Sequence, residues 1–140
     1  MAAIPAAFNH RGRAPLTHKF TCKTSDTFVL YQLVYFDSGS STTVTATTGA
    51  NGETAIGIAM EAITTAAAGR EIEIMLLGDG DIFPLINGSS CTAGVKVAIE
   101  GTDGRVTDVG ATPASGSVIG IALATTSTDG DYLPVLISNH

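Results

Sequence analysis

The chain has 140 residues, a length that fits one compact domain with a core large enough to fold without disulfide or metal support. Only 14% of the residues are charged, against about 25% in an average soluble domain; tryptophan is absent and the net charge is −6. This composition excludes a strongly basic nucleic-acid-binding surface, and no apolar run approaches the roughly 18 residues that a membrane-spanning helix needs.

The charges are distributed unevenly along the chain. The first 23 residues contain Arg11, Arg13, Lys19 and Lys23 and no acid, which gives +4, whereas the other three basic and thirteen acidic residues give −10. Residues 1–25 also contain prolines and a glycine without hydrophobic periodicity, which is typical of an extended segment. We predict an extended N-terminal arm over residues 1–25 that docks on a protein surface through these cations; a loose, solvated tail is the alternative.

The first regular element is expected in the apolar and aromatic run at residues 28–36, whose length and composition fit a strand that is buried or covered on both faces. A turn is predicted at residues 37–39. The mostly β-branched residues 42–47 predict a more exposed strand, and Gly-Ala-Asn-Gly at 49–52 predicts a loop or hairpin connection. Frequent Gly, Thr, Val and Ile favour β-structure over helix.

An internal repeat gives the strongest indication of architecture. The tetrapeptide Ile-Gly-Ile-Ala at residues 56–59 recurs at residues 119–122, an offset of 63 residues. Flanking residues match at the same offset, and after a two-residue deletion downstream they match again. We therefore predict two copies of one β-unit, over about residues 26–78 and 90–140. The equivalent positions are Val34 and Val97, Phe36 and Ile99, Asp37 and Glu100, Gly69 and Gly130, and finally Ile72, Ile74 and Leu76 with Leu133, Val135 and Ile137.

The side-chain period supports strands in both copies. Large apolar residues alternate with small or polar ones, so one face of each strand is expected to point inward. Gly57 and Gly120 fall in mid-strand, where a glycine indicates a bulge, a sharp bend or a close approach of two backbones. The predicted fold class is all-β: a small β-barrel or β-tulip-like domain of two similar β-units, preceded by the extended arm. Residues 26–140 are expected to form this single domain.

Two segments are less regular. Residues 82–86 contain Pro84, which lacks an N–H for a sheet ladder and so predicts an edge strand. Residues 61–68 are rich in alanine, but two threonines at their centre favour a loop over a helical turn.

Residues able to carry out catalysis are few. Histidine occurs only at His10, His18 and His140, near the chain ends, where a catalytic group is poorly held. Asp79 and Asp81 flank a glycine, which is chiefly a turn pattern, although with a further acid they would suit an oxygen-ligand cation site. We predict no catalytic residues, no cofactor and no metal.

The cysteines, Cys22 and Cys91, have neither metal-ligand nor redox spacing. We expect both to be unpaired thiols.

The second repeat carries a family resemblance. It contains Ala-Gly-Val-Lys-Val at residues 93–97, a Gly-containing turn within 103–107, Val-Ile-Gly-Ile-Ala within 118–124, and a last apolar strand within 129–137. This stretch resembles the capsid-cement family of tailed phages, in which an Ala-Gly-x-x-Val strand, a Gly-containing turn and a Val-Ile-Gly-x-Ala strand precede a terminal strand. The chain departs from the shortest members by its basic arm and its fuller first half.

The resemblance implies a structural virion protein that decorates a phage head. Such proteins commonly form homotrimers at local threefold positions of the major capsid protein, on the capsid exterior, and reinforce the shell. The expected partner is therefore the major capsid protein, with no direct nucleic-acid or membrane partner, after synthesis in the host cytoplasm. We expect the cations Arg11, Arg13, Lys19 and Lys23 to bind the capsid, and apolar faces near residues 28–36 and 82–86 to join the copies.

Three other functions fit a small β protein. The first is a receptor- or glycan-binding virion module, although tryptophan is absent and the three tyrosines fall in expected strands. The second is a small β-barrel enzyme with an active site between subunits. The third is a head-tail assembly protein.

Overall fold

The computed structural model of the protein describes residues 16–46, 55–78, 80–88, 90–100, 104–108 and 118–138. These residues form strands and no helix, which confirms the predicted all-β fold class. The strands are β1 (Thr17–Cys22), β2 (Leu33–Phe36), β3 (Thr43–Thr45), β4 (Gly57–Ala59), β5 (Glu71–Leu76), β6 (Ile82–Ile86), β7 (Lys96–Glu100), β8 (Arg105–Asp108), β9 (Val118–Ala122) and β10 (Tyr132–Ile137).

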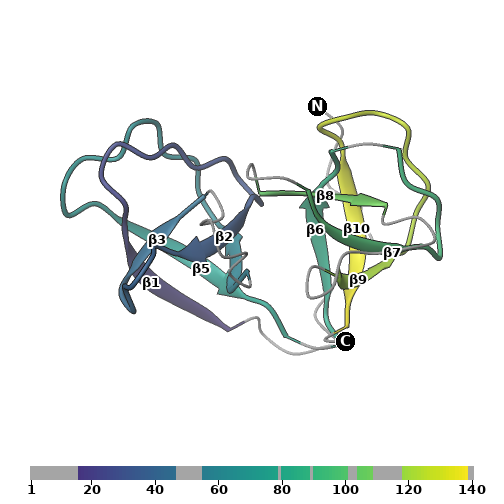
Figure 1. The fold of residues 1–140 in the computed structure, drawn as a ribbon, viewed down its shortest axis with the longest axis horizontal. Helices are drawn as coiled ribbons and strands as arrows, with labels where there is room; N and C mark the ends of the chain where they lie inside the picture. The colour runs from purple at the N-terminus through teal and green to yellow at the C-terminus, as the bar shows by residue number, and fades with distance from the viewer. Residues whose placement is uncertain are drawn as a thin grey trace. The chain divides into compact units, whose positions relative to one another are not determined.

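The strands fall into two compact units (Figure 1). The first unit contains β1–β5 and also Gly104; the second contains β6–β10. The sequence predicted one domain over residues 26–140, whereas the described part of this range divides between the two units. The division follows the repeat, because each copy encloses buried apolar side chains of its own.

The first unit is a closed barrel with the strand order β1-β3-β2-β4-β5. Strand β1 closes it, running antiparallel to β5, with Thr17 opposite Met75, and parallel to β3, with Thr21 opposite Thr43. Residues 17–22 were predicted to belong to the extended arm, and the structure places them in the barrel wall. Their sequence, Thr-His-Lys-Phe-Thr-Cys, has a weak strand pattern, so their conformation depends on pairing with β5.

The second unit repeats this topology strand for strand. Read around the closed barrel in the other direction, the first unit has the order β1-β5-β4-β2-β3. The second unit has the order β6-β10-β9-β7-β8, so β6 to β10 take the places of β1 to β5. The parallel contact that corresponds to β1–β3 is a single bridge between Asn87 and Val106. Along its length β6 pairs only with β10 among the described strands, with Pro84 opposite Pro134, so the predicted edge position of residues 82–86 is confirmed.

Backbone hydrogen bonds repeat at the same offset. The N–H of Ala59 donates to the carbonyl of Gln32, and the N–H of Ala122 donates to that of Val95, both at 2.9 Å. Beyond the two-residue deletion in the repeat alignment, the N–H of Leu77 donates to the carbonyl of Ile56 at 3.1 Å. In the second unit the N–H of Ser138 donates to the carbonyl of Ile119 at 2.9 Å. The two units are therefore copies at the level of single hydrogen bonds.

Gly57 and Gly120 occupy equivalent places where two strands approach closely. A Cβ at Gly57 would lie 2.3 Å from the carbonyl oxygen of Met75, and one at Gly120 would lie 2.2 Å from that of Leu136. Each glycine is thus required because a side chain would meet the backbone of β5 or β10. The sequence predicted a bulge, a sharp bend or a close backbone approach at both positions, and the structure shows the close approach. A register shift lies beside Gly120, between Val97 and Ala98 of β7.

Each unit buries one set of inward-facing residues. Those that form the core of the first unit are Cys22, Phe28, Val34, Val44, Ala46, Ala59, Ile63, Ala66, Ile72 and Ile74. In the second unit the buried apolar residues include Phe83, Leu85, Val97, Val106, Ala122, Leu133 and Val135. The alternation predicted for β5 and β10 is observed in the buried positions Ile72, Ile74, Leu133, Val135 and Ile137.

Candidate docking surfaces

The four cations predicted to bind a partner do not share one environment. Arg11 and Arg13 lie outside the described residues. Lys19 lies in β1, and Lys23 immediately follows that strand; both side chains are exposed. Because β1 belongs to the barrel wall, Lys19 and Lys23 are fixed on the surface of the first unit rather than carried by an arm.

Lys19 lies in a polar depression of about 480 Å³ on the first unit. It is opposite Glu73 in the β1–β5 register, and the Arg70 guanidinium lies 3.6 Å from the Glu61 carboxylate. The Arg70–Glu61 pair is half-exposed, so it contributes at most about 1 kcal/mol. Two cations and three carboxylates make the depression mixed in charge. Its lining is Lys19, Glu61, Gly69, Arg70, Glu71 and Glu73.

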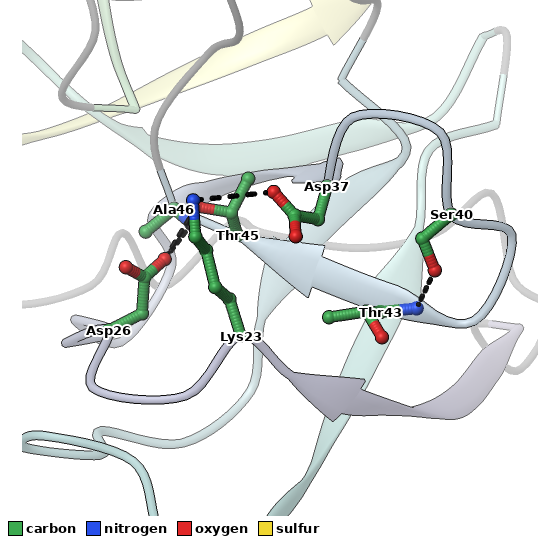
Figure 2. A network of polar contacts seen from close by, with 7 residues as sticks. All are labelled: Lys23, Asp26, Asp37, Ser40, Thr43, Thr45 and Ala46. Atoms are coloured by element: carbon green, nitrogen blue, oxygen red, sulfur yellow. Dashed lines mark hydrogen bonds and ion pairs between the residues drawn. The ribbon is translucent and has the colours of Figure 1, made fainter. Parts of the chain in front are cut away.

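Lys23 belongs to a network that ties the end of β1 to β3 (Figure 2). Its ammonium lies 3.4 Å from the Asp37 carboxylate. The Asp26 carboxylate accepts hydrogen bonds from the Thr45 hydroxyl and, at 3.3 Å, from the N–H of Ala46. Figure 2 also shows the Ser40 hydroxyl accepting the N–H of Thr43 at 2.9 Å. Lys23 is therefore engaged within the unit, which the sequence did not indicate.

The Lys23–Asp37 pair is expected to contribute little to stability. Its side chains are 48% and 30% exposed, so replacing Lys23 with glutamine should lower the free energy of unfolding by less than about 1 kcal/mol. Urea unfolding at low and high salt checks this, and the loss should shrink at high salt because ions screen the pair. A loss that exceeds this value and is independent of salt would contradict the prediction.

A loop of residues 29–32 connects Phe28 to β2. The Val29 side chain is 41% exposed, and Leu30 and Tyr31 are half-buried. Two hydrogen bonds between Gln32 and Val29 close the loop. The N–H of Gln32 donates to the Val29 carbonyl at 3.0 Å, and the side-chain oxygen of Gln32 accepts the N–H of Val29 at 3.0 Å. Residues 28–36 were predicted as one strand. The strand begins only at Leu33, because Gln32 reverses the chain before it.

Tyr31 has an unusual backbone conformation. Its φ is 68°, in the left-handed region that favours glycine. Ser25 and the β-branched Thr65 also have positive φ, and both are exposed. A bulky residue in this region is a genuine outlier, and such outliers cluster at functional sites.

Both cysteines are buried thiols that form no disulfide, as expected from their spacing. Burial raises the pKa of the Cys22 thiol above its ordinary 9.0; the Arg70 charge opposes this shift, and Glu61 and Asp26 add to it. The Cys91 thiol donates to the side-chain oxygen of the buried Asn87, at 3.4 Å. The thiols therefore act as core side chains.

The raised pKa predicts a pH dependence of stability. The folded protein keeps the Cys22 proton to higher pH than the unfolded chain does, so this thiol has no effect below pH 9.0. As pH rises above that value, the free energy of unfolding should fall, because only the unfolded chain releases the proton. Urea unfolding at pH about 8 and about 10 should show a smaller fall for Cys22→Ala than for the wild type. Equal falls would contradict the prediction.

Of the groups considered for catalysis or metal binding, His10, His140 and Asp79 lie outside the described residues. His18 is exposed on β1, with its ring 4.7 Å from that of Phe20, and Asp81 is buried in the turn before β6. No three His, Cys, Asp or Glu residues of the described part are grouped closely enough to hold a metal ion. Within the same residues, no helix has the length and apolar character needed to cross a membrane.

Comparison with known proteins identifies the fold. No protein-family model matches the sequence, and no curated protein sequence matches it. The structure is similar to the crystal structure of the N base of the head fiber gp8.5 in bacteriophage phi29, with a TM-score of 0.64 and 18% sequence identity. The match covers 89% of this chain and 96% of that chain. It therefore includes strands of both units.

Proposed function

We propose that this chain is a non-enzymatic structural protein of a phage head, which binds the outer surface of the capsid and stabilises the shell. The observation that carries the proposal is the fold shared with the phi29 head-fiber base over 89% of the chain. The resemblance of residues 93–137 to capsid-cement proteins supports it independently. The partner on this proposal is the major capsid protein, and the chain acts as a homotrimer on the capsid exterior.

The surface of the first unit supports binding through many weak contacts. Its described cations lie beside carboxylates, so each ionic contact with a partner would be modest. A symmetric shell multiplies such contacts, and an oligomer that engages several sites gains avidity without any tight single contact.

The test is to add the purified chain to capsids of the encoding phage that lack it. We expect the chain to co-sediment with the capsids, electron microscopy to show added density at local threefold positions, and the particles to release DNA at a higher temperature. Density confined to the portal vertex would instead indicate a head-tail assembly protein. A chain that binds no part of the capsid would refute the proposal.

The same likeness supports a second candidate, a receptor- or glycan-binding virion module, because the similar structure is the base of a head fiber. A glycan array separates the two functions. Specific, strong glycan binding without any effect on capsid stability would favour the second candidate.

The role of the cations is a separate part of the proposal. Deleting residues 1–24 would remove β1 and open the barrel, so charge substitutions are the suitable test. If Arg11, Arg13 and Lys19 bind the capsid, replacing them with glutamine should weaken binding and reduce its salt dependence. Glu71→Gln in the same charged depression is the matched control, because it removes a charge of opposite sign. Unchanged affinity and salt dependence would exclude a capsid-binding role for the cations.

A further inference from the structure

The loop of residues 29–32 has a close copy in the second unit, at residues 92–95. Both loops follow a residue in an antiparallel bridge, Phe28 with Ile63 and Cys91 with Thr126, and both closing N–H groups, of Gln32 and Val95, donate to the first residue of the loop. The N–H of Tyr31 donates to Ala59 at 2.8 Å, and the N–H of Gly94 donates to Ala122 at 2.7 Å. The two backbones therefore follow the same path.

The side chains of the two loops differ. Gly94 has a φ of 91°, which glycine adopts freely, whereas Tyr31 holds the equivalent conformation with a large ring. The other loop residues change in the same sense: Val29 and Leu30 stand where the second unit has Thr92 and Ala93. The first unit thus presents a larger and more apolar loop on the same backbone, and does so in an unfavourable conformation.

The local chain around this loop carries no charge. Residues 27–36 contain neither acids nor bases, although the protein as a whole has a net charge of −6. An uncharged loop with a tyrosine and two aliphatic side chains fits an uncharged protein surface, because no charged group has to be desolvated. Tyrosine is also among the residues that most often dominate protein-protein binding energy.

We infer that the loop of residues 29–31 inserts into an uncharged pocket of the capsid protein, with Tyr31 as its anchor. This inference rests on the proposed function and names the contact surface. The depression described on the first unit of a second copy is a poor receiver for this loop, because it is lined by two cations and three carboxylates, which an apolar loop would leave buried and unpaired. On this inference, binding by the Tyr31 ring compensates for the unfavourable backbone conformation of that residue.

The test compares the wild type with Tyr31→Gly and with the triple variant Val29→Thr, Leu30→Ala, Tyr31→Gly, which copies the loop of the second unit. Binding to capsids that lack the chain is measured by co-sedimentation, and unfolding is followed by a thermal melt. We expect each variant to lose at least about tenfold in affinity, equivalent to about 1.4 kcal/mol. The melting temperature of Tyr31→Gly should be equal to or higher than that of the wild type, because the strain is removed.

A matched control uses the other loop. Thr92→Val with Ala93→Leu makes the second unit equally apolar while keeping Gly94, and it should leave affinity unchanged. Wild-type affinity in the triple variant would overturn the inference and leave the proposed function intact. A large fall in the melting temperature of Tyr31→Gly would show a packing role instead, and a change in oligomeric state would show that the loop joins copies. If the wild type itself binds no capsid, the proposed function and the inference both fail.

Discussion

Replacing Gly57 with alanine is expected to lower the free energy of unfolding of the first unit by about 3 kcal/mol, the upper part of the usual range for overpacking. The new Cβ would lie 2.3 Å from the Met75 carbonyl oxygen and 2.6 Å from Cγ2 of Ile74. The first of these atoms belongs to the backbone of β5, which cannot move without disturbing its pairing with β1 and β4. Urea unfolding followed by circular dichroism measures the loss.

The repeat supplies a matched experiment. Gly120→Ala should have a similar effect on the second unit, because its Cβ would lie 2.2 Å from the Leu136 carbonyl oxygen and 2.8 Å from Cγ1 of Val135. Gly69→Ala and Gly130→Ala are the controls: both positions have positive φ but open space, so each substitution should cost only about 1 kcal/mol of backbone strain. If all four variants lost the same stability, the close approach of the strands would not be the reason for Gly57 and Gly120.

The second large effect is expected for Phe28→Ala, which should lower the free energy of unfolding by about 3–5 kcal/mol. The ring is 1% exposed and belongs to the core of the first unit, so its removal leaves a cavity among aliphatic side chains. Phe28 also precedes the loop of residues 29–32, and its bridge to Ile63 holds the start of that loop. Denaturant unfolding measures the loss.

The adjacent residue is the control for that experiment. Val29→Ala removes methyl groups from a side chain that is 41% exposed, so stability should change by less than about 0.5 kcal/mol. A loss at Phe28 no greater than the loss at Val29 would show that the core of the first unit does not depend on this ring.

Much of the fold could be predicted from the sequence because the chain repeats itself. One four-residue match would have been weak, but the 63-residue offset placed Gly57 on Gly120, and after a two-residue deletion the apolar alternation of β5 aligned with that of β10. Alternation and mid-strand glycine are local signals, and each reflects which face of a strand is covered. These signals therefore predicted many of the strands and their duplication, and they included the close backbone approach as one of three alternatives for the mid-strand glycines.

Strand β1 and the division into two units could not be predicted in the same way. Residues 17–22 alternate polar and aromatic side chains beside two lysines, and they become a strand only through partners far along the chain, such as Met75. Whether two repeats share one core or enclose two depends on closure of the barrel between β1 and β3, which no local pattern encodes.

The candidate site was predicted only in part. The sequence identified cations, and it could not show that Lys23 lies beside Asp37 or that Lys19 lies among glutamates. It pointed to residues 28–36 as an apolar contact, but it treated them as a strand. Extending the 63-residue alignment upstream would have placed Tyr31 on Gly94, and a tyrosine opposite a glycine is a signal that the sequence does contain.

The pairing of first strand with last in each unit has a consequence for folding kinetics. In the first unit β1 lies beside β5, and in the second β6 lies beside β10, so neither sheet is complete until the two ends of its repeat have met. Bringing distant residues into contact costs loop-closure entropy before any packing compensates for that cost. Topologies of this kind therefore fold slowly. Because β1 and β6 occupy equivalent places in their units, either strand could pair with β5 while the chain folds. The native pairing is reached only if the side chains of β1 make it form faster than the pairing with β6.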